Sequence, residues 1–173
     1  MKLLIVSDSH GLTEELDELK ARHKEEVDKW IHCGDSELSA ADKSISGFTT
    51  VRGNCDAEES FPNDVVKNAG DYKLLVTHGH LYTVKSTLMK LSYRARELQA
   101  NIVCFGHSHL LGAERIDNTL FLNPGSLRLP RGRKEKTYMI LHLEKDTATV
   151  YVHQKDGREL EDLRSTFSLL KRA

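Results

Sequence analysis

Short runs of apolar residues alternate with polar loops along most of the chain. Five of these runs have the length and composition of buried strands, at residues 2–6, 28–32, 48–51, 72–77 and 101–105. Segments with helical spacing separate the first three runs. This β-α-β-α-β alternation predicts an α/β fold with parallel strand pairs and right-handed crossovers.

Apolar residues at helical spacing mark the segments between the strands. Leu12, Leu16 and Leu19 predict a helix for which Thr13 is the expected N-cap. A short helix is expected over residues 39–46. A longer helix is expected to end near residue 99, with four apolar side chains on one face: Val84, Leu88, Leu91 and Leu98.

Beyond residue 112 the pattern changes to short strands separated by turns. Residues 112–116, 120–122, 137–143 and 147–152 are expected to form a meander, and residues 65–66 a short edge strand. The tail from residue 156 favours a terminal helix, because four of its apolar residues follow helical spacing: Leu160, Leu163, Phe167 and Leu170. The chain has no internal repeat, linker or low-complexity segment, so we interpret residues 1–173 as one domain.

Polar clusters follow five of the predicted strands, each at the point where the strand ends. They are Asp8-x-His10, Gly34-Asp35, Gly53-Asn54, His78 and His107-x-His109. Any one of them alone is better explained as a turn or a helix cap. Together they indicate one site, because ligands of open α/β sheets bind beyond the carboxyl ends of the strands.

The side chains in these clusters are carboxylates, imidazoles and one amide, which together predict a metal site. Mixed oxygen and nitrogen ligation suits Mn²⁺, Fe or Zn²⁺ and argues against a structural zinc finger. Seven such ligands are too many for one ion. They fit two ions about 3.5–4 Å apart that share a bridging carboxylate.

Composition and charge narrow the function further. The 173 residues are 39% hydrophobic and 29% charged, which is typical of a globular protein. The net charge of −1 and the single Trp give neither a basic stripe nor a stacking groove, so long nucleic acid is not an expected partner. No apolar run approaches the ~20 residues of a membrane helix. The chain has three widely spaced cysteines, Cys33, Cys55 and Cys104, which form neither a disulfide framework nor a CxxC zinc motif. This pattern favours a cytoplasmic location for the protein.

The order DxH, GD, GNCD, HGH and GHSH resembles the calcineurin-like metallophosphoesterase superfamily. The short length, the GNCD form and the segment Asn123-Pro124-Gly125-Ser126 are similar to its small bacterial and archaeal phosphodiesterase branch, the YfcE/YsnB type. The resemblance implies a four-layer α/β/β/α sandwich of two mixed sheets. It also implies metal-dependent hydrolysis of small phosphodiesters, with a hydroxide held between two ions as the nucleophile.

The resemblance also implies a role for each residue. One metal would be held by Asp8, His10 and His109, the other by Asn54, His78 and His107, and Asp35 would bridge the two. The expected catalytic residues are Asp35, Asn54 and His80, and the expected substrate contacts are Asn54, His80 and Arg128. His80 competes with His78 as a ligand, but the family pattern favours His78. Mn²⁺ is the favoured ion of the pair, with Zn²⁺, Fe²⁺ and Ni²⁺ as alternatives.

Cys55 departs from the family pattern, and the basic segment 128–136 lies outside it. Many relatives have a histidine where this chain has Cys55, and a thiol with pKa about 8.5 is a poorer proton donor near neutrality. We interpret Cys55 as a small packing residue, which leaves Asp56 without a histidine to orient. The basic segment 128–136 either is a solvated loop or brings Arg128 or Arg131 to a substrate phosphate.

Two other functions remain as alternatives to the phosphodiesterase. One is a protein-interaction scaffold, because a eukaryotic retromer subunit of this fold serves chiefly as a platform. Retention of all seven ligand types argues against it. The other is a phosphomonoesterase. The expected partner is a small phosphodiester substrate, and no association with a membrane is expected. Assembly into a homo-oligomer is left open.

Overall fold

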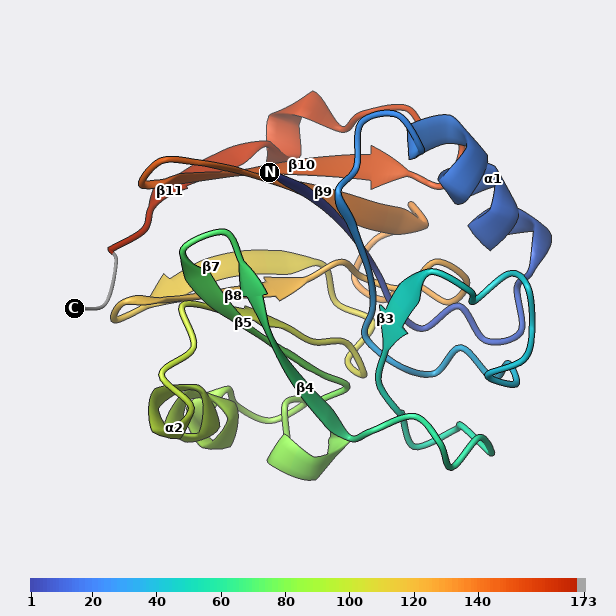
Figure 1. Cartoon of the computed structure of the whole chain (residues 1–173), viewed down its shortest axis with the longest axis horizontal. Helices are drawn as coiled ribbons and strands as arrows, with labels where there is room; N and C mark the ends of the chain where they lie inside the picture. Colours follow the sequence, from blue (N-terminus) through green and yellow to red (C-terminus); the bar gives the residue numbers. More distant parts are fainter. Residues whose placement is uncertain (171–173) are drawn as a thin grey trace.

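Two mixed β-sheets lie face to face in the computed structural model, which describes residues 1–170 (Figure 1). The first sheet has the strand order β11-β10-β9-β1-β2-β3. In it β1, β2 and β3 are parallel, whereas β9, β10 and β11 continue the sheet in antiparallel pairs. Its strands are β1 (Lys2–Val6), β2 (Lys29–His32), β3 (Phe48–Thr50), β9 (Thr137–Glu144), β10 (Thr147–Gln154) and β11 (Ser165–Ser168).

The second sheet has the strand order β4-β5-β6-β8-β7. Its three central strands, β5, β6 and β8, are parallel, and the edge strands β4 and β7 pair with them antiparallel. Its strands are β4 (Asp64–Ala69), β5 (Tyr72–Thr77), β6 (Ile102–Cys104), β7 (Gly112–Ile116) and β8 (Thr119–Asn123). Each sheet therefore has a parallel group whose carboxyl ends share one edge.

Alternation along β1 builds two cores at once, because successive side chains of a strand point to opposite faces. Leu3 and Ile5 belong to the apolar cluster between the two sheets. Leu4 and Val6 face outward and pack with Leu16 of α1 (Glu14–His23), which covers the outer face of the first sheet. Complete burial of a Leu or Val side chain contributes roughly 1.5–3 kcal/mol to stability. The strand is therefore fixed from both sides.

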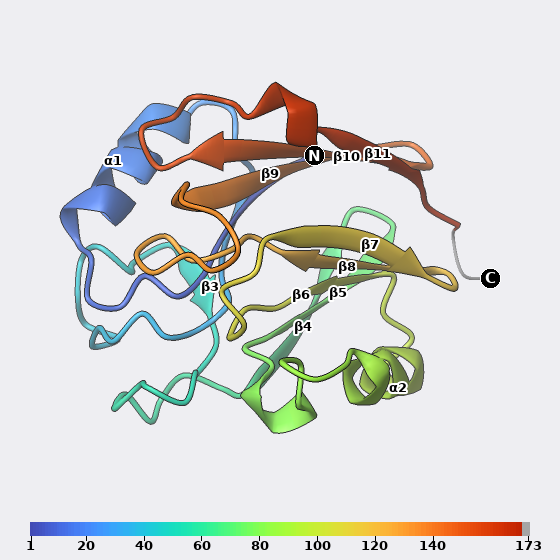
Figure 2. The same cartoon turned by 180° about the vertical axis from the view of Figure 1, so that it is seen from behind.

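The second sheet repeats this arrangement with α2 (Met89–Glu97). Leu74 of β5 faces the first sheet, whereas Leu75 faces outward and packs in a cluster that contains Leu91 and Ala95 of α2. Figure 2 shows the resulting order of layers, with α1 and α2 on opposite sides of the pair of sheets. This is the four-layer sandwich that the resemblance implied, and that expectation is confirmed.

The short helix expected over residues 39–46 is wrong, because this segment forms turns. Side chains in it bond to nearby backbone groups and so compete with helical hydrogen bonds. The Ser39 hydroxyl accepts from the N–H of Ala41 at 3.2 Å, and Asp42 accepts from the N–H of Ser44 at 2.8 Å. The crossover between β2 and β3 is therefore made without a helix.

The terminal helix expected from residue 156 is also wrong. A short 3₁₀ turn, Glu161–Leu163, is followed by β11, which pairs antiparallel with β10. Phe167 packs against the cluster between the sheets, while its neighbours along the strand are exposed. Pairing with the edge of the first sheet therefore outweighs the helical spacing of the leucines.

Three further expectations need adjustment. The expected meander is two hairpins, β7-β8 and β9-β10, which lie in different sheets. The helix after His80 starts only at Met89, after the 3₁₀ turn His80–Tyr82 and further turns. Thr13 stands at the N-cap of α1 but makes no side-chain capping bond. Within residues 1–170, no helix is long and apolar enough to cross a membrane.

Candidate metal centre

Loops at the carboxyl ends of both parallel groups meet between the sheets and form the candidate site. The loop after β1 is joined to the loop after β2 by a hydrogen bond from Asp8 N–H to Gly34 O at 3.0 Å. It also meets the second sheet, because Asp8 Oδ2 accepts from the N–H of His107 at 3.1 Å. Gly106 N–H donates to His78 O at 2.9 Å and joins the loops after β5 and β6. The loop after β3 is joined to the loop after β2 by the Cys55 N–H, which donates to Asp35 Oδ1 at 2.8 Å. The predicted convergence of the five clusters is thus observed.

One half of the site consists of Asp8, His10 and His109. His109 Nε2 lies 3.1 Å from Asp8 Oδ1 and 3.3 Å from His10 Nε2. His10 Nε2 lies 3.8 Å from the same Asp8 oxygen. All three donor atoms lie within 4.8 Å of one another, a spacing that suits the coordination of one cation.

The other half consists of Asp35, Asn54, His78 and His107. His78 Nε2 lies 3.2 Å from Asp35 Oδ2 and 3.1 Å from Asn54 Oδ1. Donor atoms of Asp35, His78 and His107 lie within 4.8 Å of one another. Asp35 also forms such a group with His10 and Cys55, so its carboxylate faces both halves.

Three of the histidines are anchored through Nδ1. This nitrogen lies 2.7 Å from Cys33 O in His78, 2.7 Å from Leu129 O in His109 and 2.6 Å from Glu37 Oε1 in His10. An imidazole that donates through Nδ1 in its neutral form leaves the lone pair on Nε2. In each case Nε2 is the nitrogen that faces the cluster, which is the orientation that a metal ligand requires.

Asp8 supplies direct evidence that the cluster suits a cation. Its side chain is fully buried, and Oδ1 has no hydrogen-bond partner. Oδ2, in contrast, accepts from Ser7 Oγ at 2.6 Å and from the His107 N–H. A buried carboxylate oxygen without a partner is costly unless a positive charge faces it. The donor set present here therefore fits a divalent metal.

The two carboxylates of the site are held in the ionised form. Burial alone would raise the pKa of Asp8, but the imidazole of His109, 3.1 Å from Oδ1, and the charge of His78 outweigh this and lower it. Burial also opposes ionisation of Asp35, and the hydrogen bond and charge of His78 lower its pKa well below the usual range. Both residues therefore present negative charge to a cation.

The backbone around the site is strained in a consistent way. Five predicted ligands have positive φ angles, a conformation that L-residues rarely adopt: Asp8 (52°), His10 (44°), Asp35 (56°), His107 (69°) and His109 (59°). Such residues persist only where their surroundings hold them, and they concentrate at functional sites. The strain turns these side chains away from the strand direction and into one space.

Two glycines permit the close approach of the loops. A Cβ atom at Gly53 would lie 2.0 Å from Asp35 Oδ1, and one at Gly106 would lie 2.0 Å from Ser7 Oγ. No ordinary side chain fits at either position. The Gly-Asn and Gly-His motifs therefore have a steric reason as well as a chemical one.

The sequence interpretation gave no role to Asp56, which organises the site. Its buried carboxylate accepts the N–H groups of Asp35 at 2.9 Å, Gly53 at 2.6 Å and Glu37 at 2.8 Å. It thus joins the loop after β3 to the loop after β2 and positions the Asp35 backbone. Its place two residues after Asn54 in the GNCD motif was the available signal.

Ser126 is a second residue that the sequence interpretation left without a role. Its hydroxyl donates to Asp8 O at 2.7 Å and accepts from Leu129 N–H at 2.7 Å. It therefore connects the strained backbone at Asp8 to the residue whose carbonyl orients His109. The resemblance of the segment Asn123-Pro124-Gly125-Ser126 had pointed to this loop.

The interpretation of Cys55 as a packing residue is wrong. Cys55 is exposed, and its Sγ belongs to the donor group with His10 and Asp35. Partial burial and then the negative charge of Asp35 raise the pKa of the thiol to about 11. A thiol with this pKa is a weak general acid near neutral pH.

His80 and Arg128 lie at the border of the cluster. The His80 ring is centred 5.4 Å from that of His78 and 6.1 Å from that of His107, and its buried Nδ1 has no partner. The Arg128 Nη1 donates to the carbonyl oxygen of His10. Arg131, the other predicted contact, bonds to His109 O only through its backbone N–H at 3.0 Å. The geometry therefore favours Arg128 over Arg131.

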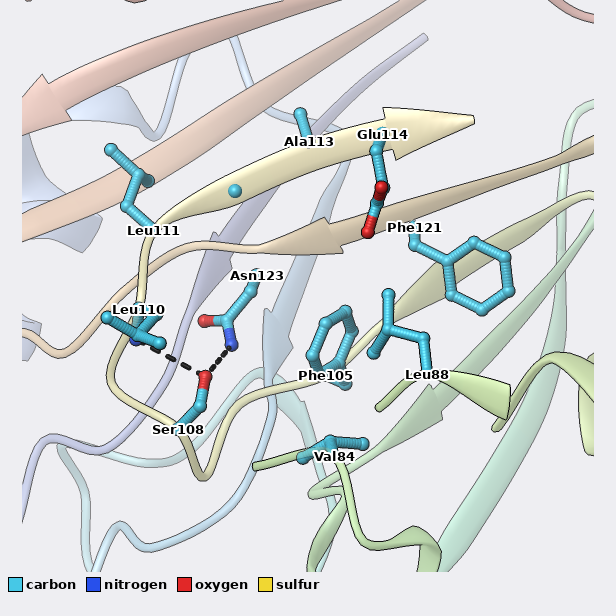
Figure 3. Close-up of a pocket in the computed structure, with 11 residues that line it drawn as sticks. Val84, Leu88, Phe105, Ser108, Leu110, Leu111, Ala113, Glu114, Phe121 and Asn123 are labelled. Atoms are coloured by element: carbon cyan, nitrogen blue, oxygen red, sulfur yellow. Dashed lines mark hydrogen bonds between the residues drawn. The ribbon is translucent and has the colours of Figure 1, made fainter. Parts of the chain in front are cut away.

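A separate cavity of about 360 Å³, lined by both apolar and polar side chains, borders Ser108 of the loop after β6 (Figure 3). Its walls include Val84, Phe105 and Phe121, which belong to the cluster on the outer face of the second sheet. Ser108 borders it and is bonded to Asn123 Nδ2 at 3.0 Å. None of the predicted ligands lines this cavity, so the polar cluster is the candidate for chemistry.

Comparison with protein families gives one match that covers most of the chain. Residues 1–146 match the calcineurin-like phosphoesterase superfamily domain. A curated relative is the probable metallophosphoesterase YsnB of Bacillus subtilis, with 49% identity over 169 residues, covering 98% of this chain and 100% of that protein.

Solved structures agree with this match. A conserved protein from Streptococcus pneumoniae, described as a predicted phosphoesterase, superposes with a TM-score of 0.92 and 34% identity, covering 96% of this chain and 97% of that one. Vps29 of Entamoeba histolytica, solved in complex with Zn²⁺, has a TM-score of 0.73 and 18% identity, covering 98% of each chain. At that identity, the Vps29 comparison shows a shared fold alone.

Proposed function

Because this chain belongs to the calcineurin-like phosphoesterase superfamily, we propose that it is a metal-dependent phosphodiesterase that acts on small phosphodiesters. The observation that supports this proposal best is the position of Asp35 between two groups of donor atoms. One group is completed by His78 and His107, and the other contains His10. A scaffold protein gains nothing from burying such a set of charges, because buried ionisable groups are costly.

The roles we propose follow from this geometry. Asp8, His10 and His109 would hold one divalent cation, Asn54, His78 and His107 a second, and Asp35 both. Two bound cations would supply an activated water as nucleophile and neutralise charge on the phosphoryl oxygens. Asp35 would contribute negative charge that offsets the mutual repulsion of the cations.

The chain's own polar groups would orient the substrate. Asn54, with one side of its amide toward the cluster, and His80, with an unpartnered Nδ1, flank the second half of the site. Arg128 lies beside His10 and is the guanidinium that we propose for pairing with a phosphate oxygen. Glu37, which accepts from His10 Nδ1, adds a negative charge to the same border.

Charge and acidity both favour a diester over a monoester. A diester carries one negative charge, whereas a monoester carries up to two near neutral pH, and the border of the site offers acidic Glu37 as well as Arg128. A monoester or alkyl diester also needs a proton donor for its leaving oxygen. The thiol of Cys55, with pKa about 11, is poorly suited to that role.

We propose Mn²⁺ as the ion, with Zn²⁺, Fe²⁺ and Ni²⁺ as alternatives, since all accept oxygen and nitrogen ligands. We further propose that residues 1–173 form one domain and that the protein is cytoplasmic. The three cysteines are unpaired, as expected in a reducing compartment. Neither a membrane nor long nucleic acid is a proposed partner, and a homo-oligomer is compatible with this function.

The test is hydrolysis by metal-stripped protein to which single metals are added back. Substrates are bis(aryl) and alkyl aryl phosphodiesters, dialkyl diesters and the matching monoesters, chosen to span a range of leaving-group pKa. We expect turnover of aryl diesters with Mn²⁺ and a steep fall in kcat/KM as the leaving-group pKa rises. General acid catalysis normally contributes about 10²–10⁴-fold, which this site would lack for poor leaving groups.

The same panel separates the alternatives. Faster hydrolysis of monoesters than of diesters would identify a phosphomonoesterase. Absence of turnover on every ester, in protein that binds two metals per chain, would favour the scaffold. A flat dependence on leaving-group pKa would mean that a general acid is present, with His80 the first residue to substitute.

A further inference from the structure

Cys55 introduces a thiol into a donor set that otherwise contains only oxygen and nitrogen. Its Sγ lies with His10 and Asp35 in one group whose donor atoms are all within 4.8 Å of one another. The Asn54 Nδ2 lies 3.5 Å from the same sulfur. The residue is exposed, so the thiol is accessible to a metal that enters from solvent.

The local backbone holds Cys55 in this position. Its N–H donates to Asp35 Oδ1 at 2.8 Å, which fixes the residue against the carboxylate that faces both halves of the site. Asp56, the next residue, is anchored by three backbone N–H groups. The backbone at Cys55 is therefore fixed, and Sγ can change its position by a small rotation of the side chain alone.

An independent observation indicates that a cation belongs at this place. The Oδ1 atom of fully buried Asp8 has no hydrogen-bond partner and faces His109 Nε2 at 3.1 Å and His10 Nε2 at 3.8 Å. His10 is thus shared between the Asp8 group and the Cys55 group. A cation held by His10 would therefore lie near the carboxylates of Asp8 and Asp35 and near the Cys55 thiol.

We infer that Cys55 is an additional ligand for the ion that His10 and Asp35 contact, and that it biases this position toward thiophilic metals. The inference rests on the proposed function, since it concerns the same centre. Formation of the metal–sulfur bond releases the thiol proton to solvent, and the sulfur supplies the electron pair without any change in oxidation state. Thiolate ligation favours Zn²⁺ over Mn²⁺, which prefers oxygen donors.

The test uses the full chain, stripped of metal and titrated with Co²⁺. Thiolate bound to Co²⁺ gives a charge-transfer band in the near ultraviolet that nitrogen and oxygen ligands do not give. We expect this band in the unmodified protein and its loss in Cys55→Ser. Cys104→Ala is the matched control, because Cys104 is buried in the cluster between the sheets and should leave the band intact.

A second readout does not depend on any variant. We expect Zn²⁺ to protect Cys55 of the unmodified protein from alkylation, as measured by peptide mass spectrometry, and Mn²⁺ to protect it less. Cys33 and Cys104 are buried and should be unreactive in both conditions. Competition between Zn²⁺ and Mn²⁺ should show a fall of about tenfold in Zn²⁺ preference in Cys55→Ser, since even outer partners of a metal contribute about 10–100-fold to affinity.

The outcomes separate this inference from the function on which it rests. Binding of two Co²⁺ without a charge-transfer band, or equal alkylation with and without Zn²⁺, would overturn the role of Cys55 and leave the dinuclear centre standing. A band that persists in Cys55→Ser would overturn it as well. Failure to bind any divalent metal would instead overturn the proposed function itself.

Discussion

Asp35 belongs to donor groups in both halves of the candidate site. Its backbone N–H is held by Asp56, its Oδ1 by the Cys55 N–H, and its Oδ2 faces His78. The left-handed φ of 56° turns the side chain out of line with β2 and toward the second sheet. A carboxylate fixed by three neighbours, with its pKa well below the usual range, is suited to lie between two cations.

Asp35→Asn should therefore reduce both the hydrolysis of phosphodiesters and the number of metals bound. The amide retains the size of the side chain and an acceptor for the Cys55 N–H, but it loses the negative charge that both halves share. We expect hydrolysis of aryl diesters to fall by more than the roughly 10–100-fold that loss of an outer partner causes. Elemental analysis should show fewer than two metals per chain.

His109→Ala provides the comparison, because His109 contacts only the Asp8 half of the site. His109→Ala should weaken the binding of the metal in that half and leave the binding of the other metal unchanged. Retention of two metals and normal turnover by Asp35→Asn would show that this carboxylate does not bridge.

Arg128 offers a prediction about substrate binding rather than metal binding. Its guanidinium is tied to the His10 carbonyl at the border of the cluster. Charge-assisted hydrogen bonds contribute about 1.5–3 kcal/mol when shielded and less at an exposed edge. Arg128→Ala should therefore raise KM for aryl diesters several-fold with little change in kcat and an unchanged metal content.

Arg131→Ala is the matched control, since the only described bond of Arg131 to the site uses its backbone. It should have no effect on KM. Equal kinetics for both variants and the unmodified enzyme would mean that the basic segment is solvated surface.

At the level of elements, the sequence predicted those helices and strands whose position depends on neighbouring residues. The strand β1 and the cluster after it were predictable, because burial on both faces and a strand-end Asp8-x-His10 motif leave their trace in adjacent residues. The strand β11 was not, because Phe167 is placed by pairing with β10, a partner fixed by the fold rather than by spacing. Residues 39–46 were misjudged for the opposite reason, since the bonds of Ser39 and Asp42 to nearby backbone override weak helical spacing.

The convergence of the candidate donor side chains could be predicted from the sequence, whereas their roles stay predictions. The donors could be recognised from their chemistry and order, but the residues that position them could not. Asp56 acts through backbone N–H groups of a different loop, which no sequence spacing reveals. Cys55 was misjudged because its exposure depends on how the loop after β3 faces the loop after β2.

The contact between these two loops can be tested at Gly53. A Cβ atom there would lie 2.0 Å from Asp35 Oδ1 and 2.6 Å from Asp35 N, which forces the loops apart. Gly53→Ala should cost roughly 1–3 kcal/mol of stability, the usual effect of overpacking. It should also reduce metal content, because Asp35 is displaced. Thermal denaturation and elemental analysis measure the two effects.

Gly112→Ala is the control for this substitution. A Cβ at Gly112 in the edge strand β7 meets no atom within 4 Å, and its φ is not in the left-handed region. It should leave both stability and metal content unchanged. A similar result for Gly53→Ala would mean that the loops do not require the close approach.

At the scale of the whole molecule, the site lies where the two sheets meet. Four of the proposed ligands follow strands of the first sheet: Asp8, His10, Asp35 and Asn54. The other three follow strands of the second: His78, His107 and His109. The apolar cluster joins the sheets through their inner faces, whereas the loops that carry these ligands join them at one edge. Any ion bound there would connect the sheets a second time.

Metal binding should therefore stabilise the whole fold rather than a single loop. A ligand that binds only the folded state adds about 2.7 kcal/mol at one hundred times its Kd. For a chain of this size that corresponds to a rise in Tm of roughly 5–10 °C. We expect this rise when Mn²⁺ is added to metal-stripped protein, and its reversal by a chelator. Hydrogen exchange should show added protection in strands of both sheets.

Variants from each sheet distinguish this coupling from local ordering. Asp8→Asn removes a ligand of the first sheet and His107→Gln one of the second, and each should reduce the metal-dependent rise in Tm because either loss opens the connection. Arg96→Ala, whose exposed guanidinium pairs only with exposed Asp117 among the described ion pairs, should keep the full rise. If metal protects only the loop after β6 from exchange, or leaves Tm unchanged while binding two ions, the centre does not couple the sheets, because an ion held by both must oppose their separation on unfolding.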